Sequence, residues 1–155
     1  MIKLFVMDVD GTLTDGKIYI GPNGECFKAF DVKDGFGIHE ILPEYGITPM
    51  IITGRTSPIV EVRAMEIGID GFYQGVRDKA QCLRDIAQSH NILLSQIACI
   101  GDDLNDLPMM KLCGLKGCPT DAVEEVQAIC DYVCNASGGH GAVREFIEWI
   151  VRRQK

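Results

Sequence analysis

Two aspartates, Asp8 and Asp10, directly follow the apolar run 2–7. Burying two like charges so close together is costly unless a cation or a reacting phosphate uses them. Residues two apart on a strand point the same way, and Gly11 lets the chain turn sharply after them. One carboxylate can then act as a nucleophile while the other moves protons. The alternative for so short a pattern is a strand that ends in a solvated acidic turn.

Two further groups suit the binding of a phosphate. Thr53 and Gly54 close the apolar run 49–52, and these residue types let O–H and N–H groups approach a phosphate. Lys79 opens an amphipathic stretch over 79–90 that predicts a helix, so its ammonium lies near the positive helix end. Taken singly, each group also fits an ordinary strand-end turn or a solvated surface lysine.

A fourth group, at the end of the apolar run 97–100, supplies three more carboxylates: Asp102, Asp103 and Asp106. Alone, this segment fits a capped helix start. Because the carboxyl ends of parallel strands meet at one edge of a sheet, all four groups are expected to share a site.

In this order, the groups resemble the four motifs of the haloacid dehalogenase superfamily of phosphohydrolases. The motifs fall in sequence at Asp8-Val9-Asp10-Gly11-Thr12, at Thr53, at Lys79, and at Gly101-Asp102-Asp103 with Asp106. Each piece lies at a predicted strand end or helix start, which is the context that the motifs require.

Composition excludes several classes of function. A length of 155 residues with 46% apolar residues suits a single domain, expected over residues 1–155. The net charge of −7 argues against binding to nucleic acid or anionic membranes. We find no apolar run of membrane-span length and no signal-peptide pattern, so a cytoplasmic location is expected. The seven cysteines are expected to be reduced thiols, with zinc ligation by Cys113, Cys118, Cys130 and Cys134 as the alternative.

Alternating apolar and helical segments predict an α/β fold, a Rossmann-like doubly wound parallel sheet with crossover helices. Strands are expected at 2–7, 48–53, 71–74, 97–100, 115–118 and 132–134. Helices are expected at 35–45, 57–68, 79–90, 106–113, 121–129 and 141–153. The segment 17–30 breaks the alternation and predicts a β-hairpin that could serve as a flap over the site. The gaps between motifs are too short for a cap domain.

Four further segments make the resemblance to one branch of this superfamily more specific. The segments 32–38, 53–59, 101–106 and 138–145 are similar to those of the capless 3-deoxy-D-manno-octulosonate 8-phosphate phosphatases. That branch implies Mg²⁺ dependence and a homotetramer in which hairpins form a central barrel and a neighbouring subunit helps to wall the site. His140 stands where the branch commonly has lysine or arginine. The related 2-keto-3-deoxynononate 9-phosphate phosphatases typically carry an acidic residue where this chain has Arg55.

Together with the chemistry of phosphate esters, this resemblance implies a two-step mechanism. Asp8 attacks phosphorus and forms an aspartyl phosphate, while Asp10 protonates the departing sugar oxygen and then activates water. Mg²⁺ would be held by the Asp8 carboxylate, the Asp10 backbone carbonyl and Asp102. The phosphoryl group would be bound by Thr53, Gly54 and Lys79.

The remaining expected roles concern the rest of the substrate and the support of the site. Arg55 and Arg63 could bind a substrate carboxylate, or Arg63 could be a solvated residue paired with Glu61 or Glu66. Supporting roles toward Lys79 and metal-bound waters fall to Asp103 and Asp106. Three other functions stay open: a 2-keto-3-deoxynononate 9-phosphate phosphatase, a non-catalytic assembly module related to sugar-acid cytidylyltransferase domains, and a phosphomutase.

Overall fold

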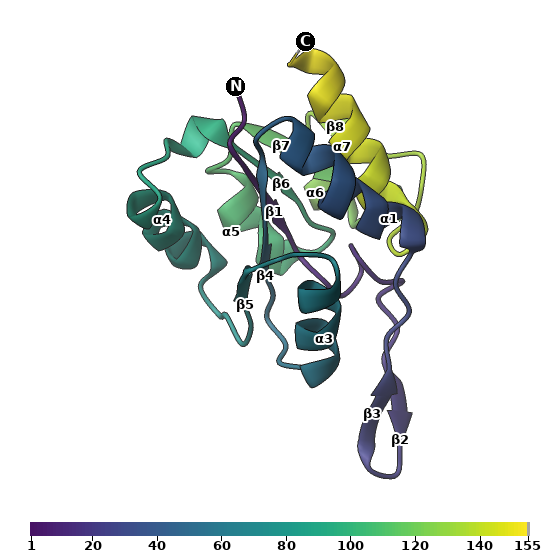
Figure 1. Ribbon diagram of the computed structural model, residues 1–155. Helices are drawn as coiled ribbons and strands as arrows, with labels where there is room; N and C mark the ends of the chain where they lie inside the picture. The colour runs from purple at the N-terminus through teal and green to yellow at the C-terminus, as the bar shows by residue number, and fades with distance from the viewer. Residues whose placement is uncertain (155) are drawn as a thin grey trace.

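Six parallel strands form one sheet in the computed structural model, which describes residues 1–154. Their order is β5-β4-β1-β6-β7-β8 (Figure 1). The strands are β1 Leu4–Met7, β4 Thr48–Ile52, β5 Gly71–Tyr73, β6 Ile97–Ile100, β7 Leu115–Cys118 and β8 Tyr132–Val133. The predicted Rossmann-like α/β sheet is therefore confirmed.

The strand β1 lies at the point where the sheet changes direction. Leu4 pairs with Thr48 of β4 on one side and with Ile97 of β6 on the other. The chain first extends the sheet from β1 to β4 and β5, and then returns to build β6, β7 and β8 on the opposite side. In open α/β sheets, ligands bind at the carboxyl ends of the strands at such a switch point.

Alternate side chains of the central strand enter two cores. Leu4 and Val6 pack into one core, and Phe5 and Met7 into the other, all fully buried. The first core is covered by α4 Lys79–Ser89, α5 Leu107–Met110 and α6 Glu124–Gln127. The second is covered by α3 Pro58–Glu66, α7 Ala142–Arg153 and the helix that begins with α1 Val32–Phe36. Figure 1 shows α4 and α7 on opposite sides of the sheet.

The helix after the hairpin differs in extent from the predicted 35–45. It begins at Val32 because the Asp31 side chain accepts a hydrogen bond from the N–H of Lys33 and caps it. It continues through a π-helical turn, η1 Gly37–Ile41, into α2 Leu42–Glu44. The predicted helices 106–113 and 121–129 are shorter, as α5 and α6, and short 3₁₀ turns precede β6 (η2 Leu94–Gln96) and α5 (η3 Leu104–Asp106).

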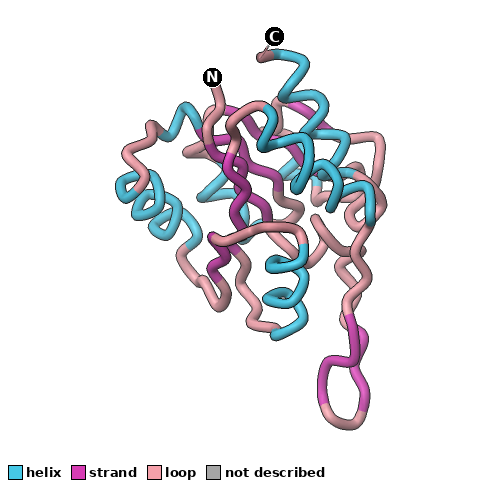
Figure 2. The backbone as a smooth tube through the Cα atoms, viewed as in Figure 1, coloured by secondary structure: helices cyan, strands magenta, loops and turns pink. Residues whose placement is uncertain are grey.

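The predicted hairpin is formed by β2 Tyr19–Gly21 and β3 Gly24–Phe27, which pair antiparallel. It extends away from the sheet and its helices (Figures 1 and 2). The rings of Tyr19 and Phe27 stack with centroids 4.3 Å apart, and Ile20 is 72% exposed. A two-stranded hairpin with an exposed apolar surface is marginal in water without a partner.

Two segments noted in the sequence, 32–38 and 138–145, contact each other beside β1. The side chain of Asp34 accepts a hydrogen bond of 2.9 Å from the N–H of Arg144 at the start of α7. Just before α7, Gly139 adopts a φ of +73° and donates its N–H to the carbonyl of Thr12. A Cβ at Gly138 would lie 1.9 Å from the carbonyl oxygen of Gly11. The glycines therefore let this loop pack directly on the loop that follows the first motif.

Two features of residues 1–154 concern membrane spans and potential zinc ligands. None of the helices described there combines the length and the apolar character needed to cross a bilayer. The cysteines are all free, and the acidic cluster described below is the one group of potential metal ligands found in this part of the chain.

Candidate active site

The carboxyl ends of the central strands line a pocket of about 260 Å³. Seven of the residues predicted from the motifs contribute to it: Asp8, Asp10, Thr53, Gly54, Arg55, Asp102 and Asp103. Gly16 and Asn105 complete the lining. The fold thus gathers residues from three of the four motifs around this pocket, at the switch point of the sheet.

Lys79 lies buried behind the pocket and braces the first aspartate. Its ammonium donates hydrogen bonds of 2.8 Å to Asp8 Oδ1 and 2.6 Å to Asp106 Oδ1. Burial opposes the charge on Lys79, but the two carboxylates outweigh it and raise the pKa of Lys79. This cation therefore stays charged and fixes the orientation of Asp8, with its Nζ close enough to help neutralise an attached phosphoryl group.

Asp106 organises the fourth motif around this lysine. Its Oδ2 accepts the N–H groups of Asp102 and Asp103 at 3.0 and 3.3 Å, and its side chain is fully buried. Asp103 caps the following turn by accepting the N–H of Leu104 at 2.7 Å. Asp106 thus contacts Lys79 as expected for a supporting residue, while Asp103 lies at the rim of the pocket.

The surroundings of Asp8 and Asp102 disfavour the ionised forms of both carboxyl groups. Burial and then the charge of Asp106 raise the pKa of Asp8 to about 6, although Lys79 opposes the shift. Burial and the charges of Asp8 and Asp106 raise the pKa of Asp102 to about 8. Thr12 donates a hydrogen bond of 3.1 Å to Asp102 Oδ1, which offsets only part of this effect.

A divalent cation would favour the ionised forms of these clustered carboxyl groups. Ligand oxygens of Asp8, Asp102 and Asp106 lie within 4.8 Å of one another. Asp106 is already engaged by Lys79 and two N–H groups, so Asp8 and Asp102 are the carboxylates available to a metal. A Cβ on Gly11, whose φ is +93°, would lie 2.0 Å from Asp102 Oδ2, so glycine is required for Asp102 to occupy this position. Oxygen ligands of this type suit Mg²⁺.

Asp10 is held by a residue that sequence reasoning missed. The ammonium of Lys28, at the base of the hairpin, lies 2.5 Å from Asp10 Oδ1 and 3.1 Å from Glu25. Glu25 also accepts a hydrogen bond of 2.6 Å from the hydroxyl of Ser57. Because Lys28 is 18 residues from Asp10 and follows an exposed turn, no local pattern separates it from a solvated hairpin lysine.

The two arginines predicted to bind a substrate carboxylate lie in different places. Arg55 lines the pocket, and its half-exposed guanidinium lies 3.4 Å from Glu25. Arg63 lines a separate hollow between α1 and α3, where it pairs with Glu66 at 2.9 Å and lies over the Phe30 ring. Within one chain, the structure does not bring Arg63 to the active-site pocket. Its ion pair with Glu66 matches the alternative expectation, in which Arg63 pairs with a neighbouring glutamate on its helix.

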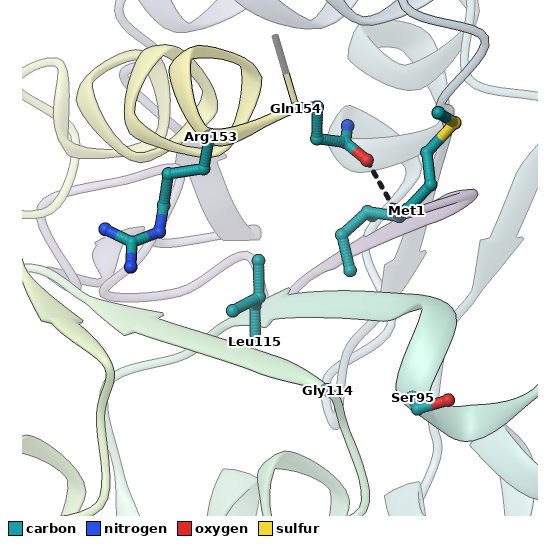
Figure 3. A pocket seen from close by; sticks show the side chains of 7 residues that line it. Met1, Ser95, Gly114, Leu115, Arg153 and Gln154 are labelled. Carbon is teal, nitrogen blue, oxygen red and sulfur yellow. Dashed lines mark hydrogen bonds between the residues drawn. The ribbon is translucent and has the colours of Figure 1, made fainter.

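A larger hollow of about 440 Å³ lies at the opposite end of the sheet, beside the start of β7 (Figure 3). There the side chain of Gln154 accepts the N–H of Ile2, and Arg153, Leu115 and Ser95 contribute to the lining. This hollow contains no carboxylate cluster, whereas the smaller pocket at the carboxyl ends contains four aspartates. The chemistry therefore belongs to the smaller pocket.

Comparison with known proteins agrees with this geometry. The family model of haloacid dehalogenase-like hydrolases matches residues 68–147. The 3-deoxy-D-manno-octulosonate 8-phosphate phosphatase KdsC of Escherichia coli K12 is 42% identical over 153 residues, which cover 99% of this chain and 81% of that protein. This chain belongs to the haloacid dehalogenase-like hydrolases, in the octulosonate 8-phosphate phosphatase family.

Solved structures of octulosonate 8-phosphate phosphatases have the same fold. The cobalt-bound Haemophilus influenzae protein is 38% identical, with a TM-score of 0.94, over 99% of this chain and 89% of that one. The Moraxella catarrhalis protein is 44% identical, with a TM-score of 0.93, over 97% and 86% of the two chains. That structure is a complex with magnesium ion, phosphate ion and a KDO molecule. The sequence, the fold and the site therefore all indicate a haloacid dehalogenase-like phosphatase that uses Mg²⁺.

The raised pKa values predict how metal binding depends on pH. Between about pH 4, the usual pKa of aspartate, and pH 8, the folded state binds protons at Asp8 and Asp102 more tightly than the unfolded state does. Stability of the metal-free protein should therefore fall as pH rises through this window. Mg²⁺ at about 100 times its Kd should raise Tm by roughly 5–10 °C at pH 8. At pH 5.5, where protons compete, the increase should be smaller.

Thermal unfolding with EDTA or MgCl₂ at the two pH values measures this effect. In Asp102→Asn, the increase in Tm with MgCl₂ should be lost at both pH values. An increase that is equal at pH 5.5 and pH 8 in the unmodified protein would show that these two carboxylates do not govern metal binding.

Proposed function

We propose that this phosphatase hydrolyses the phosphate monoester of a 2-keto-3-deoxy sugar acid, 3-deoxy-D-manno-octulosonate 8-phosphate. The observation that carries the proposal is the pocket in which Asp8, braced by Lys79, faces Asp10 and Asp102. The family membership supports the choice of sugar acid. The same pocket argues against an assembly module, because such a module has no use for buried, uncompensated carboxylates.

In the proposed first step, an Asp8 carboxylate oxygen attacks phosphorus and the bond from phosphorus to the sugar oxygen breaks. Asp10 gives its proton to that oxygen. In the second step Asp10 removes a proton from water, the water oxygen bonds to phosphorus, and the bond to Asp8 breaks, which releases inorganic phosphate. Thr53 and Gly54 border the phosphoryl group, and Lys79 offsets its charge. When bound by Asp8, Asp102 and the Asp10 carbonyl, Mg²⁺ would supply further positive charge.

Release of inorganic phosphate from a panel of esters tests this function. The panel contains the eight-carbon and nine-carbon 2-keto-3-deoxy acid phosphates and simple hexose phosphates, each with MgCl₂ and with EDTA. We expect the eight-carbon ester to have the highest kcat/KM and EDTA to abolish release. Interconversion of phosphate esters without release would indicate a phosphomutase, and no reaction with any ester would indicate an assembly module.

Arg55 is expected to recognise the carboxylate of the substrate. A charged hydrogen bond in a partly buried site contributes about 1.5–3 kcal/mol, so Arg55→Ala should lower kcat/KM for the sugar-acid ester roughly ten- to a hundred-fold. Hexose phosphates have no carboxylate, so their kcat/KM should change little. Arg84→Ala, an exposed arginine on α4, is the matched control. An equal loss with every ester would make Arg55 a phosphate ligand.

We further propose that residues 1–155 form one domain that acts in the cytoplasm as a homotetramer, with the hairpins in the subunit interface. The exposed apolar surface of the hairpin, Ile20 and Phe27, supports this assembly. Ile20→Glu would bring like charges together in such an interface, at a cost of several kcal/mol. Light scattering should therefore give smaller species with lower activity. Leu93→Glu, an equally exposed site before η2, should remain tetrameric, and a tetrameric Ile20→Glu protein would exclude the hairpin interface.

A further inference from the structure

Each of the two aspartates of the first motif has its own buried lysine. Lys79 contacts Asp8, and Lys28 contacts Asp10, and each lysine side chain is only 1% exposed. Lys79 belongs to a known motif of the fold. Lys28 belongs to the hairpin segment, outside the four motifs.

We propose that Lys28 is a positioning residue for proton transfer by Asp10, an inference that rests on the proposed phosphatase function. Its ammonium lies 2.5 Å from Asp10 Oδ1. Asp10 lines the pocket and Lys28 does not, so Lys28 acts on the substrate only through Asp10. Among the hydrogen bonds of residues 1–154, Asp10 uses Oδ1 alone, which leaves Oδ2 to exchange a proton with the sugar oxygen.

Lys28 is itself held in place from the other side. Glu25 pairs with Lys28 at 3.1 Å, accepts the hydroxyl of Ser57 at 2.6 Å, and lies 3.4 Å from Arg55. Ser57 caps α3, the helix that follows the Thr53 motif. The base of the hairpin therefore connects Asp10 to the loop that follows Thr53. The orientation of Asp10 thus depends on the contacts that hold the hairpin base against this loop.

A simpler role for the same contacts is anchoring of the hairpin, because removal of one partner of a buried ion pair is destabilising in any protein. The two roles predict different kinetics. Proton transfer to the leaving group matters for a sugar alkoxide, whereas p-nitrophenolate departs without a proton at neutral pH. Loss of a positioned Asp10 must therefore affect the sugar-acid ester more than p-nitrophenyl phosphate, while loss of an anchor affects both equally.

The test compares kcat/KM for these two esters on the same preparation of each variant, since their ratio does not depend on the fraction of folded enzyme. General acid catalysis contributes about 10²–10⁴-fold, so Lys28→Met should lower kcat/KM for 3-deoxy-D-manno-octulosonate 8-phosphate by about ten- to a hundred-fold. For p-nitrophenyl phosphate the loss should stay below about three-fold. Lys17→Met, an exposed lysine of the same segment, is the control and should change neither value.

Lys28→Arg keeps the charge and should restore part of the ratio between the two esters, and it decides the question if the methionine variant does not fold. Equal losses with both esters, or no loss with either, would overturn the role of Lys28. Failure of the proposed function gives a different result, because the unmodified enzyme would then not hydrolyse 3-deoxy-D-manno-octulosonate 8-phosphate.

Discussion

Asp8→Asn should abolish phosphate release, with a fall in kcat of at least about four orders of magnitude, as expected for removal of a covalent nucleophile. The amide keeps the shape of the side chain but offers no anionic oxygen to phosphorus or to Mg²⁺. It can still accept the hydrogen bond from Lys79 through its oxygen. The defect should therefore lie in chemistry and metal binding, with the fold retained.

Stability measurements separate this outcome from misfolding. Because burial and Asp106 raise the pKa of Asp8, its ionised form destabilises the metal-free protein above about pH 6. The neutral amide removes that charge, so metal-free Asp8→Asn should unfold at a temperature equal to or above that of the unmodified protein at pH 8. Acid quench after incubation with labelled ester should trap no phosphoenzyme. Turnover near the normal rate would exclude covalent catalysis by Asp8.

Asp10→Asn should bind substrate normally but lose about two to four orders of magnitude in kcat, because one side chain supplies both the acid and the base. The two steps can be resolved with p-nitrophenyl phosphate, whose first step needs no acid. A burst of p-nitrophenol, equal to the enzyme concentration and followed by slow turnover, is expected as the phosphoenzyme accumulates. The unmodified enzyme, in which Asp10 still activates water, should show no such accumulation.

A large rise in KM with little change in kcat would assign Asp10 to substrate binding instead. The Lys79 contacts of Asp8 do not involve Asp10, so the nucleophile should remain in place in this variant. Comparison of the Asp8 and Asp10 variants therefore distinguishes loss of the attack on phosphorus from loss of proton transfer.

The sheet, and the gathering of the motif residues at one edge of it, could be predicted from the sequence. Each motif follows an apolar run, and parallel strands end at one edge, so Asp8, Thr53 and Asp102 could be placed together without coordinates. The expected role of Asp106 toward Lys79 came instead from the resemblance to the haloacid dehalogenase superfamily. The segment 17–30 could be read as a hairpin because its turn residues interrupt two short apolar stretches.

The remaining contacts depend on geometry that no local pattern encodes. Lys28 reaches Asp10 because the hairpin base folds back across the loop after β1, and a lysine beside an exposed turn carries no sign of burial. Arg63 was assigned to the substrate from its charge and its place on the helix after Thr53. The helix rotation instead directs it over Phe30 and toward Glu66. Helix ends were displaced by capping, as at Asp31.

The central position of β1 has a consequence for synthesis of the chain. Leu4–Met7 pairs on one side with β4 and on the other with β6, whose first residue is Ile97. At ribosomal rates of about 5–20 residues per second, roughly 5–20 s pass between the emergence of β1 and that of its second partner. During this time a wholly apolar strand, which immediately precedes the nucleophile, has an open edge. The strand that positions the nucleophile is thus also a strand whose apolar edge stays open to non-native pairing until β6 has been made.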